Sequence, residues 1–277
     1  MRKTRVFAAA AASLALILAG CSSTPDEGEG AAPEGEANVE TIVVGASPAP
    51  HARILKFIND ELAADAGLKI EIVEYTDYII PNEALKSGDL DANFYQTVPY
   101  LEVQKEELGV DFTPGAGVHI EPLGVYSDKI TDLKDLPDGA LIGIINDTQN
   151  QGRALELLAS ADLLTLPEGE APTIFNVEKK ANFDFIEVEG PQLVRSLPDV
   201  DIAVINGNYA QEGGLTAAND ALLVEEGEGS PYANVLVWRT EDTGKENIKI
   251  LEELLHTPEV SQFIKDTWTD GSVIPAF

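Results

Sequence analysis

Arg153 is a candidate residue for binding a carboxylate group of a ligand. Arg153 closes the polar, glycine-containing stretch NDTQNQGR (146–153), which we predict to join a strand to the start of a helix. Free backbone N–H groups at a helix start and a guanidinium together form a good carboxylate site. The alternative is a surface arginine in the first helical turn, where the helix dipole makes a cation slightly unfavourable. We therefore predict that Arg153 binds an anionic group of a ligand.

Three asparagines accompany this arginine. Asn150 shares its loop, Asn206 ends a predicted strand and Asn234 begins another. A side-chain amide both donates and accepts hydrogen bonds, so it suits a zwitterionic ligand. Taken singly, each asparagine is better explained as a helix cap or a turn residue. Their role in ligand binding is therefore a hypothesis about the three asparagines together.

Three tyrosines could enclose an apolar ligand side chain. Tyr78 lies in DYIIPNEAL (77–85), and Tyr95 and Tyr100 lie in NFYQTVPY (93–100). A tyrosine ring gives an apolar wall with a polar tip. An isolated tyrosine is more simply explained by core packing, so this pocket depends on all three lying together.

No combination of residues predicts catalysis. The chain lacks the G-x-S-x-G and HExxH patterns, so we expect no enzyme and no catalytic residues. His51, His119 and His256 are far apart in the sequence, and we predict neither a metal site nor a cofactor. The formal net charge of −30 repels nucleic acid, which we exclude as a partner. The class of function that remains is a protein that binds a small molecule.

These residues must be positioned by strands and helices that alternate along the chain. Short apolar runs predict the strands, and apolar residues spaced three and four apart predict the helices. The predicted strands are 41–46, 68–75, 90–95, 140–146, 183–189, 200–206, 222–226 and 234–240. The predicted helices are 51–67, 81–89, 99–109, about 150–160, 191–197, 245–256 and 258–268. This order predicts an α/β fold with covered sheets, in which ligands bind beyond the carboxyl ends of strands.

The first 40 residues predict export and a lipid anchor. Residues 1–20 combine a basic start, an apolar run too short to span a bilayer, and small residues before Cys21. This pattern is typical of a signal that is removed once a lipid is attached to Cys21; an ordinary signal with an incidental cysteine is the alternative. Residues 21–40 have almost nothing apolar to bury, so we predict a disordered acidic linker. The folded part would then lie outside the cell membrane.

Five stretches together resemble the methionine-binding lipoproteins of the NlpA/MetQ type, which are solute receptors of methionine ABC importers. The stretches are VGASPAPHARIL (44–55), DYIIPNEALKSGDLDANFYQTVPYL (77–101), NDTQNQGRALELL (146–158), EGPQLVRSLPDVDIAVINGNYA (189–210) and SPYANVLVWR (230–239). They occur in the order of the family, and the resemblance extends from about residue 41 to the C-terminus.

The resemblance implies a two-lobed fold of the type II periplasmic-binding-protein kind, with two crossover strands and the ligand in the cleft between the lobes. Residues 41–124 and 232–277 would form the first lobe, and 125–231 the second. The implied ligand is methionine or a close derivative. The implied partners are an ABC permease with its ATPase, and the membrane through the lipid on Cys21.

The resemblance also assigns roles by position. Arg153 would pair with the ligand carboxylate, and the three asparagines would bind the amino-acid head group. The residues enclosing the ligand side chain would be Tyr78, Tyr95, Thr97 and Tyr100.

The chain departs from the family pattern inside this predicted pocket. Where the family usually reads AFQHxPYL or FFQHxPYL, this chain reads FYQTVPYL. Tyr95 therefore replaces a phenylalanine and Thr97 a histidine. A buried hydroxyl on Tyr95 needs a partner, and we expect a polar group of the ligand to be a candidate. Arg53 also takes the place of the glutamate in the sequence PHAE that is common in the family, and we expect this change to affect only the rim of the pocket.

Two other interpretations remain. The first is a receptor for another solute, such as a different amino acid, a short peptide or a metal. The second belongs to another class, a lipid-anchored surface protein acting as an adhesin or an enzyme.

Overall fold

The structure is a computed structural model that describes residues 39–277. The predicted export signal, Cys21 and nearly all of the predicted linker lie outside these residues. Within 39–277, no helix combines the length and the apolar character needed to cross a bilayer. The described residues belong to one compact unit, built around two main sheets.

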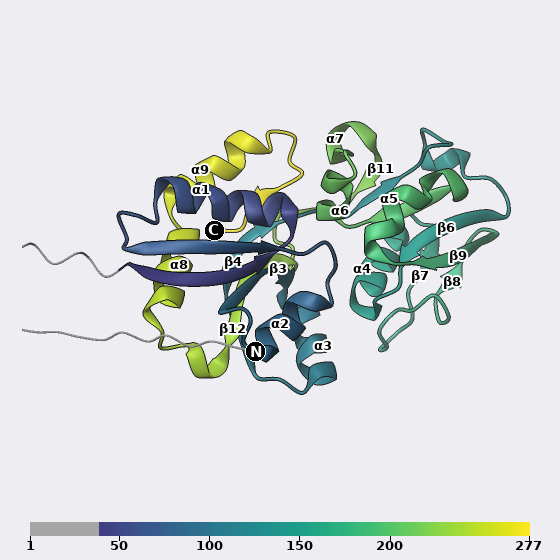
Figure 1. Cartoon of the computed structure of the whole chain (residues 1–277). Coiled ribbons are helices and arrows are strands. Elements are labelled where there is room, and N and C mark those ends of the chain that lie inside the picture. Colours follow the sequence, from purple (N-terminus) through teal and green to yellow (C-terminus); the bar gives the residue numbers. More distant parts are fainter. Residues whose placement is uncertain (1–38) are drawn as a thin grey trace, which may run out of the picture. The chain divides into compact units, whose positions relative to one another are not determined.

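The first sheet has six strands in the order β13–β4–β12–β3–β1–β2 (Figure 1). The central pairings are parallel between β1 and both β2 and β3, and antiparallel between β12 and both β3 and β4. The bounds are β1 (Glu40–Ala46), β2 (Leu68–Glu74), β3 (Ala92–Thr97), β4 (Phe112–Ile120), β12 (Ala233–Arg239) and β13 (Ile274–Pro275). We call this sheet and its helices the first lobe.

Helices cover both faces of this sheet because its strands alternate apolar residues between two cores. Ile42 and Val44 of β1 enter a core with Ile54, from α1, and Leu251, from α8. Val43, between them, packs against a second core with the helices of the opposite face. The helices are α1 (Arg53–Glu61), α8 (Glu246–Leu255) and α9 (Pro258–Thr267) on one face, and α2 (Ile80–Ser87) and α3 (Val98–Leu108) on the other.

The second sheet has five strands in the order β11–β5–β10–β6–β9. β6 pairs in parallel with β9 and β10, while β5 pairs antiparallel with β10 and β11. The bounds are β5 (Gly124–Tyr126), β6 (Ala140–Ile145), β9 (Phe183–Val188), β10 (Ile202–Ile205) and β11 (Ala221–Val224). We call this sheet and its helices the second lobe.

The second sheet is also covered on both faces. Leu155 of α4 packs with Ile142 and Ile144 of β6, whereas Ile145 faces Leu193 of α5. The helices are α4 (Thr148–Ser160), α5 (Leu193–Ser196), α6 (Gly207–Glu212) and α7 (Ala217–Asp220). The remaining elements are β7 (Leu164–Thr165), β8 (Glu178–Lys179) and the short helical turns η1 (Pro48–Ala52), η2 (Leu133–Asp135), η3 (Gly190–Gln192), η4 (Leu197–Asp199) and η5 (Thr240–Asp242).

The two-lobed α/β fold that the sequence predicts is confirmed, although the predicted strands and helices omit β4, β5, β7, β8, β13, α6 and α7. The pattern does not predict β4 because Pro114, Gly115 and Gly117 break its apolar alternation, and it does not predict β5 because that strand has only three residues. β4 is nonetheless paired on both edges, with β12 and β13. These strands matter for the site because the chain leaves the first sheet at the end of β4 and returns to it at β12.

A buried amide network fixes α2 against β3. Asn82 Nδ2 donates to Gln96 Oε1 at 3.1 Å, and Gln96 Nε2 donates to Asn82 Oδ1 and Asn93 Oδ1, both at 2.8 Å. Asn93 Nδ2 donates to Asn82 Oδ1 at 2.9 Å. All three side chains are buried, so each of these hydrogen bonds replaces one to water.

We predict that Asn82→Ala lowers the free energy of unfolding by about 1–3 kcal/mol, because it leaves buried amide groups of Gln96 and Asn93 unsatisfied. Urea unfolding would measure the change. Glu83→Ala is the matched control on the same helix, where the side chain is exposed, and should change stability by less than about 0.5 kcal/mol. Equal stability of the two variants would contradict the role of the network.

Candidate ligand-binding site

Side chains from both lobes meet at one cavity. The space that they enclose measures about 30 Å³, which is room for about two water molecules. The lining residues are His51, Tyr78, Tyr95, Gln96, Thr97, Tyr100, Glu121, Asn150, Arg153, Asn206, Gly207, Asn208 and Asn234. The structure thus brings all eight residues of the predicted ligand site together, and it adds others that the sequence analysis did not select.

Arg153 enters the cavity from the first part of α4. Its Nε donates to Glu225 Oε1 at 2.9 Å, and its Nη2 donates to Glu225 Oε2 at 2.5 Å and to the backbone oxygen of Glu121 at 2.9 Å. The guanidinium carbon lies 4.2 Å from the centre of the Tyr232 ring. These contacts fix the plane of the guanidinium, while Nη1 has no hydrogen-bond partner among the described residues. Nη1 is the group that remains available to a ligand carboxylate.

A chain of three side chains sets the direction of the Asn206 amide. Asp147 caps α4, accepting from Asn150 N at 2.8 Å. Its two carboxylate oxygens also accept from Asn150 Nδ2, at 3.2 and 3.1 Å, so that Asn150 Oδ1 turns to Asn206 Nδ2 at 2.9 Å. Asn206 Oδ1 is left buried without a partner among the described residues. Asn150 therefore orients its neighbour, and Asn206 offers the free acceptor.

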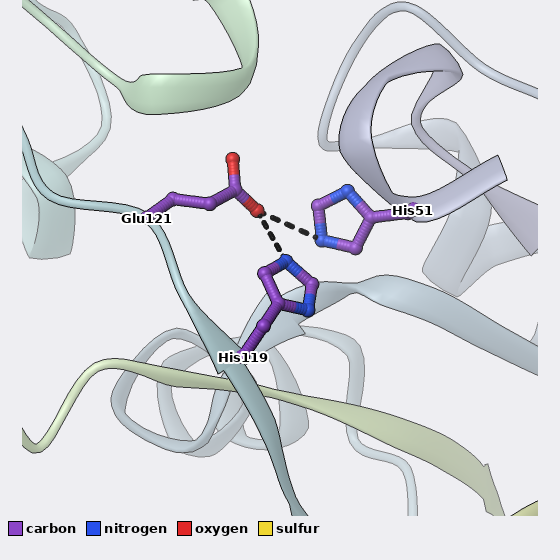
Figure 2. A group of neighbouring side chains, drawn as sticks. All are labelled: His51, His119 and Glu121. Carbon is purple, nitrogen blue, oxygen red and sulfur yellow. Dashed lines mark hydrogen bonds and ion pairs between the residues drawn. The ribbon is translucent and has the colours of Figure 1, made fainter. Parts of the chain in front are cut away.

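Asn234 lies at the start of β12, beside two histidines and a glutamate. His51 Nε2 is 3.0 Å from Asn234 Oδ1 and 3.2 Å from Glu121 Oε1, and His119 Nε2 is 2.7 Å from the same Glu121 oxygen. Figure 2 shows both rings directed at that oxygen. Burial lowers the pKa of His51 to about 4 and that of His119 to about 3, while it raises the pKa of Glu121. Both imidazoles are therefore neutral at pH 7.

This group of three is the one set of potential metal ligands among residues 39–277, with ligand atoms within 4.8 Å of one another. His256 does not join it and instead contacts the backbone oxygens of Glu252 and Gly117. A metal on the Nε2 atoms would force each ring proton onto Nδ1. Within residues 39–277, the Nδ1 atoms of His51 and His119 are both buried without a partner, and metal-bound histidines normally donate this proton to an acceptor. The geometry favours protonated Nε2 atoms, with His119 donating to Glu121 and the single Nε2–H of His51 shared between Asn234 and Glu121.

The tyrosines form one aromatic group whose hydroxyls are used within the protein. Tyr95 and Tyr100 both donate to the backbone oxygen of Tyr78 at 3.0 Å. The expectation that Tyr95 needs a polar group of the ligand is therefore not supported, because its hydroxyl already has this partner. Burial raises the pKa of Tyr78, Tyr95 and Tyr100, so all three are neutral. Thr97, the other departure from the family pattern, is opposite Asn234 in the β3–β12 register and lines the cavity.

One short helix of the second lobe makes several contacts with the first lobe. Tyr78 donates to Asn208 Oδ1 at 2.5 Å and stacks on Tyr209, with ring centres 4.8 Å apart. Trp268 Nε1, just after α9, donates to Gln211 Oε1 at 2.7 Å. Asn208, Tyr209 and Gln211 all belong to α6, which begins directly after Asn206. The position of α6 against the first lobe is thus fixed by both polar and aromatic contacts.

Glu121, Glu225 and Tyr232 are not indicated as site residues by the sequence. Each lies in a segment where the chain passes between the sheets, 121–123 or 225–232, and these segments carry no periodic pattern. The only signal was the short stretch HIEP (119–122), which places a histidine two residues before an acid. His51 was visible as a histidine after the first strand, but its partners could not be identified from spacing.

The comparisons with known proteins agree on one family. The family model described as NlpA lipoprotein matches residues 42–277. The D-methionine-binding lipoprotein MetQ of Escherichia coli K12 is 35% identical over 277 residues, with 98% of each chain covered.

Two solved structures are similar throughout the described region. A lipoprotein from Actinomyces odontolyticus is 61% identical with a TM-score of 0.84, covering 86% of this chain and 100% of its own. A nutrient-binding protein from Burkholderia cenocepacia, solved bound to methionine, is 37% identical with a TM-score of 0.81, covering 85% of this chain and 100% of its own. From the match of residues 42–277 and these full-length similarities, the chain belongs to the NlpA lipoprotein family.

Proposed function

We propose that this protein binds methionine, or a close derivative, and delivers it to an ABC importer. The observation that carries the proposal is the cavity between the lobes. A buried arginine, three tyrosines and an amide oxygen that has no partner in the described part of the chain meet there. Relatives named as methionine-binding lipoproteins, and the similar protein solved with methionine, support this choice of ligand.

The polar end of the cavity matches the head group of an amino acid. Arg153 Nη1 would donate to the ligand carboxylate, and Asn206 Oδ1 would accept from the ammonium. If His51 donates to Asn234 Oδ1, the Nδ2 group of Asn234 is left as a further donor to the carboxylate. Asn150 acts through Asn206, because its amide is bound to Asp147 and Asn206.

The aromatic end suits a thioether. Tyr78, Tyr95 and Tyr100 present ring faces and edges, with their hydroxyls satisfied elsewhere. Methionine sulfur interacts favourably with aromatic rings, and its unbranched side chain adapts to an irregular pocket. Thr97 occupies the place of the larger family histidine, so we propose that it widens this end of the pocket.

Residues of both lobes line the cavity, so we propose that the lobes separate to admit the ligand and close over it again. We propose that residues 41–124 and 232–277 move as one body and residues 125–231 as the other. The ligand contacts both lobes and therefore stabilises the closed form. No covalent bond changes in this cycle, so we propose no catalytic activity. Cys21 would anchor the protein on the extracytoplasmic side, near the permease and ATPase.

The ligand assignment is tested by isothermal titration of the purified protein with L-methionine, D-methionine and other amino acids. We expect one methionine bound per chain. At a concentration of 100 times the dissociation constant, the ligand should raise the free energy of unfolding by about 2.7 kcal/mol. Absence of heat and of any thermal shift with every methionine derivative would exclude the proposed ligand.

We predict that Arg153→Lys weakens methionine binding roughly 10- to 150-fold, because a lysine keeps the charge but loses the planar N–H groups that bind both Glu225 and the ligand. Titration calorimetry measures the loss. Arg195→Lys, on an exposed position of α5, is the matched control and should bind normally. Unchanged affinity of Arg153→Lys would exclude Arg153 as the carboxylate partner.

Trp268→Phe should weaken binding about 2- to 10-fold by removing the indole donor to Gln211, one hydrogen bond of the closed form. We expect the change mainly in the dissociation rate, measured by stopped-flow mixing. Lys265→Ala, exposed on the last turn of α9, serves as the control. A dissociation rate equal to that of the unmodified protein would show that this contact does not hold the lobes closed.

A further inference from the structure

The arginine of the cavity packs against a tyrosine that comes from the other sheet. Arg153 lies on α4, which covers the second sheet, whereas Tyr232 directly precedes β12 of the first sheet. The guanidinium carbon of Arg153 is 4.2 Å from the centre of the Tyr232 ring. Tyr232 is outside the set of described residues that line the cavity, so its side chain meets the cavity through Arg153.

A second contact fixes this tyrosine on the same helix. Its hydroxyl donates to Glu156 Oε2 at 3.0 Å. Burial raises the pKa of Tyr232 to about 12, so the hydroxyl is a donor at pH 7. Arg153 and Glu156 are three residues apart on α4 and therefore share one face of it. The ring of Tyr232 thus lies along this face, and it covers the buried guanidinium.

The other contacts of the guanidinium act in its plane. Nε and Nη2 of Arg153 both donate to Glu225, and Nη2 also donates to the backbone oxygen of Glu121. Glu225 is itself fixed, because its Oε2 accepts from the backbone N–H of Leu123 at 3.1 Å. Since all N–H groups of a guanidinium point along its plane, these bonds leave its faces uncovered. Tyr232 covers one of the two faces and opposes a tilt out of the plane.

This ring affects how strongly the arginine can bind an anion. A cation is attracted to the face of an aromatic ring. The ring also excludes water from that side of Arg153, and charges attract each other more strongly where water is excluded. Nη1, which has no hydrogen-bond partner among the described residues, is therefore held in one direction by restraints in the plane and perpendicular to it.

We propose that Tyr232 is a positioning residue for the ligand carboxylate, whose ring holds the Arg153 guanidinium so that Nη1 is presented to the cavity. This inference rests on the proposed function and adds to it. Because Tyr232 belongs to the first sheet and Arg153 to a helix on the second, the carboxylate site is complete when the lobes are closed. It loses one side when they separate.

The test compares L-methionine with L-methioninamide, which keeps the ammonium group and the side chain but has a neutral amide in place of the carboxylate. Titration calorimetry gives the ratio of the two dissociation constants, in which a general effect of a variant on lobe closure cancels. In Tyr232→Ala, the preference for methionine should fall roughly 3- to 30-fold, the range for a cation–π contact. Tyr232→Phe keeps the ring and should retain the preference within about twofold.

Three results would overturn the inference. Tyr232→Ala could bind methionine as tightly as the unmodified protein, or it could weaken both compounds by the same factor, as a merely structural role requires. Tyr232→Phe could lose the preference as fully as Tyr232→Ala, which would assign the effect to the hydroxyl. If the unmodified protein does not bind methionine at all, the proposed function itself fails.

Two controls isolate the ring. Phe175→Ala removes an aromatic side chain that is 87% exposed, from the segment between β7 and β8, and it should preserve both affinities. Urea unfolding without ligand shows whether each variant is folded. If Tyr232→Ala does not fold, Tyr232→Leu replaces it, because leucine keeps apolar volume without an aromatic face, and the preference for methionine should again fall.

Discussion

When two lobes close over polar side chains, each polar group that loses its contact with water needs a hydrogen-bond or charge partner within the protein or the ligand. A buried charge or amide without such a partner destabilises the closed form. This constraint accounts for most contacts around the cavity. Arg153 is buried and has Glu225 as its counter-charge, with Tyr232 against its plane. Asn150 has both sides of its amide bonded. Among residues 39–277, six buried side-chain atoms have no hydrogen-bond partner, and two of them, His51 Nδ1 and Asn206 Oδ1, belong to residues that line the cavity where we propose that the ligand binds.

The same constraint separates residues that contact a ligand from residues that orient others. Asp147 accepts from the side-chain amide of Asn150, and the oxygen of that amide accepts from Asn206, so these two residues determine which atom of Asn206 faces the cavity. The amide network of Asn82 and Asn93 holds Gln96, which lines the same cavity, in a similar way. Such orienting groups reduce the reorganisation that binding requires, because the acceptor already points in a useful direction before a ligand arrives.

Much of the fold could be predicted from the sequence, because strands such as β1 and β6 and helices such as α1 have a regular apolar period. β4 could not, since its proline and glycines interrupt the period while pairing with β12 and β13 supplies its stability. In the site, Arg153 was recognisable from its own loop. Glu121 and Glu225 were not, because their importance comes from partners distant in the sequence, such as His51 at one and Arg153 at the other. The spacing of residues along the chain does not indicate which distant residues come into contact.

The short helix α6 has a consequence for how this protein can change. It begins after the amide that faces the cavity, and the same six residues carry the hydrogen bonds to Tyr78 and Trp268 of the other lobe. Ligand occupancy and lobe closure are therefore linked through one element, and each must strengthen the other by the same free energy. Substitutions at Gln211, which contacts Trp268 and does not line the cavity, can alter how long a solute is retained without touching the groups that distinguish one solute from another. Retention time and selectivity are in this sense separable properties, because Gln211 lies outside the cavity whereas Asn206 and Asn208, at the start of the same helix, line it.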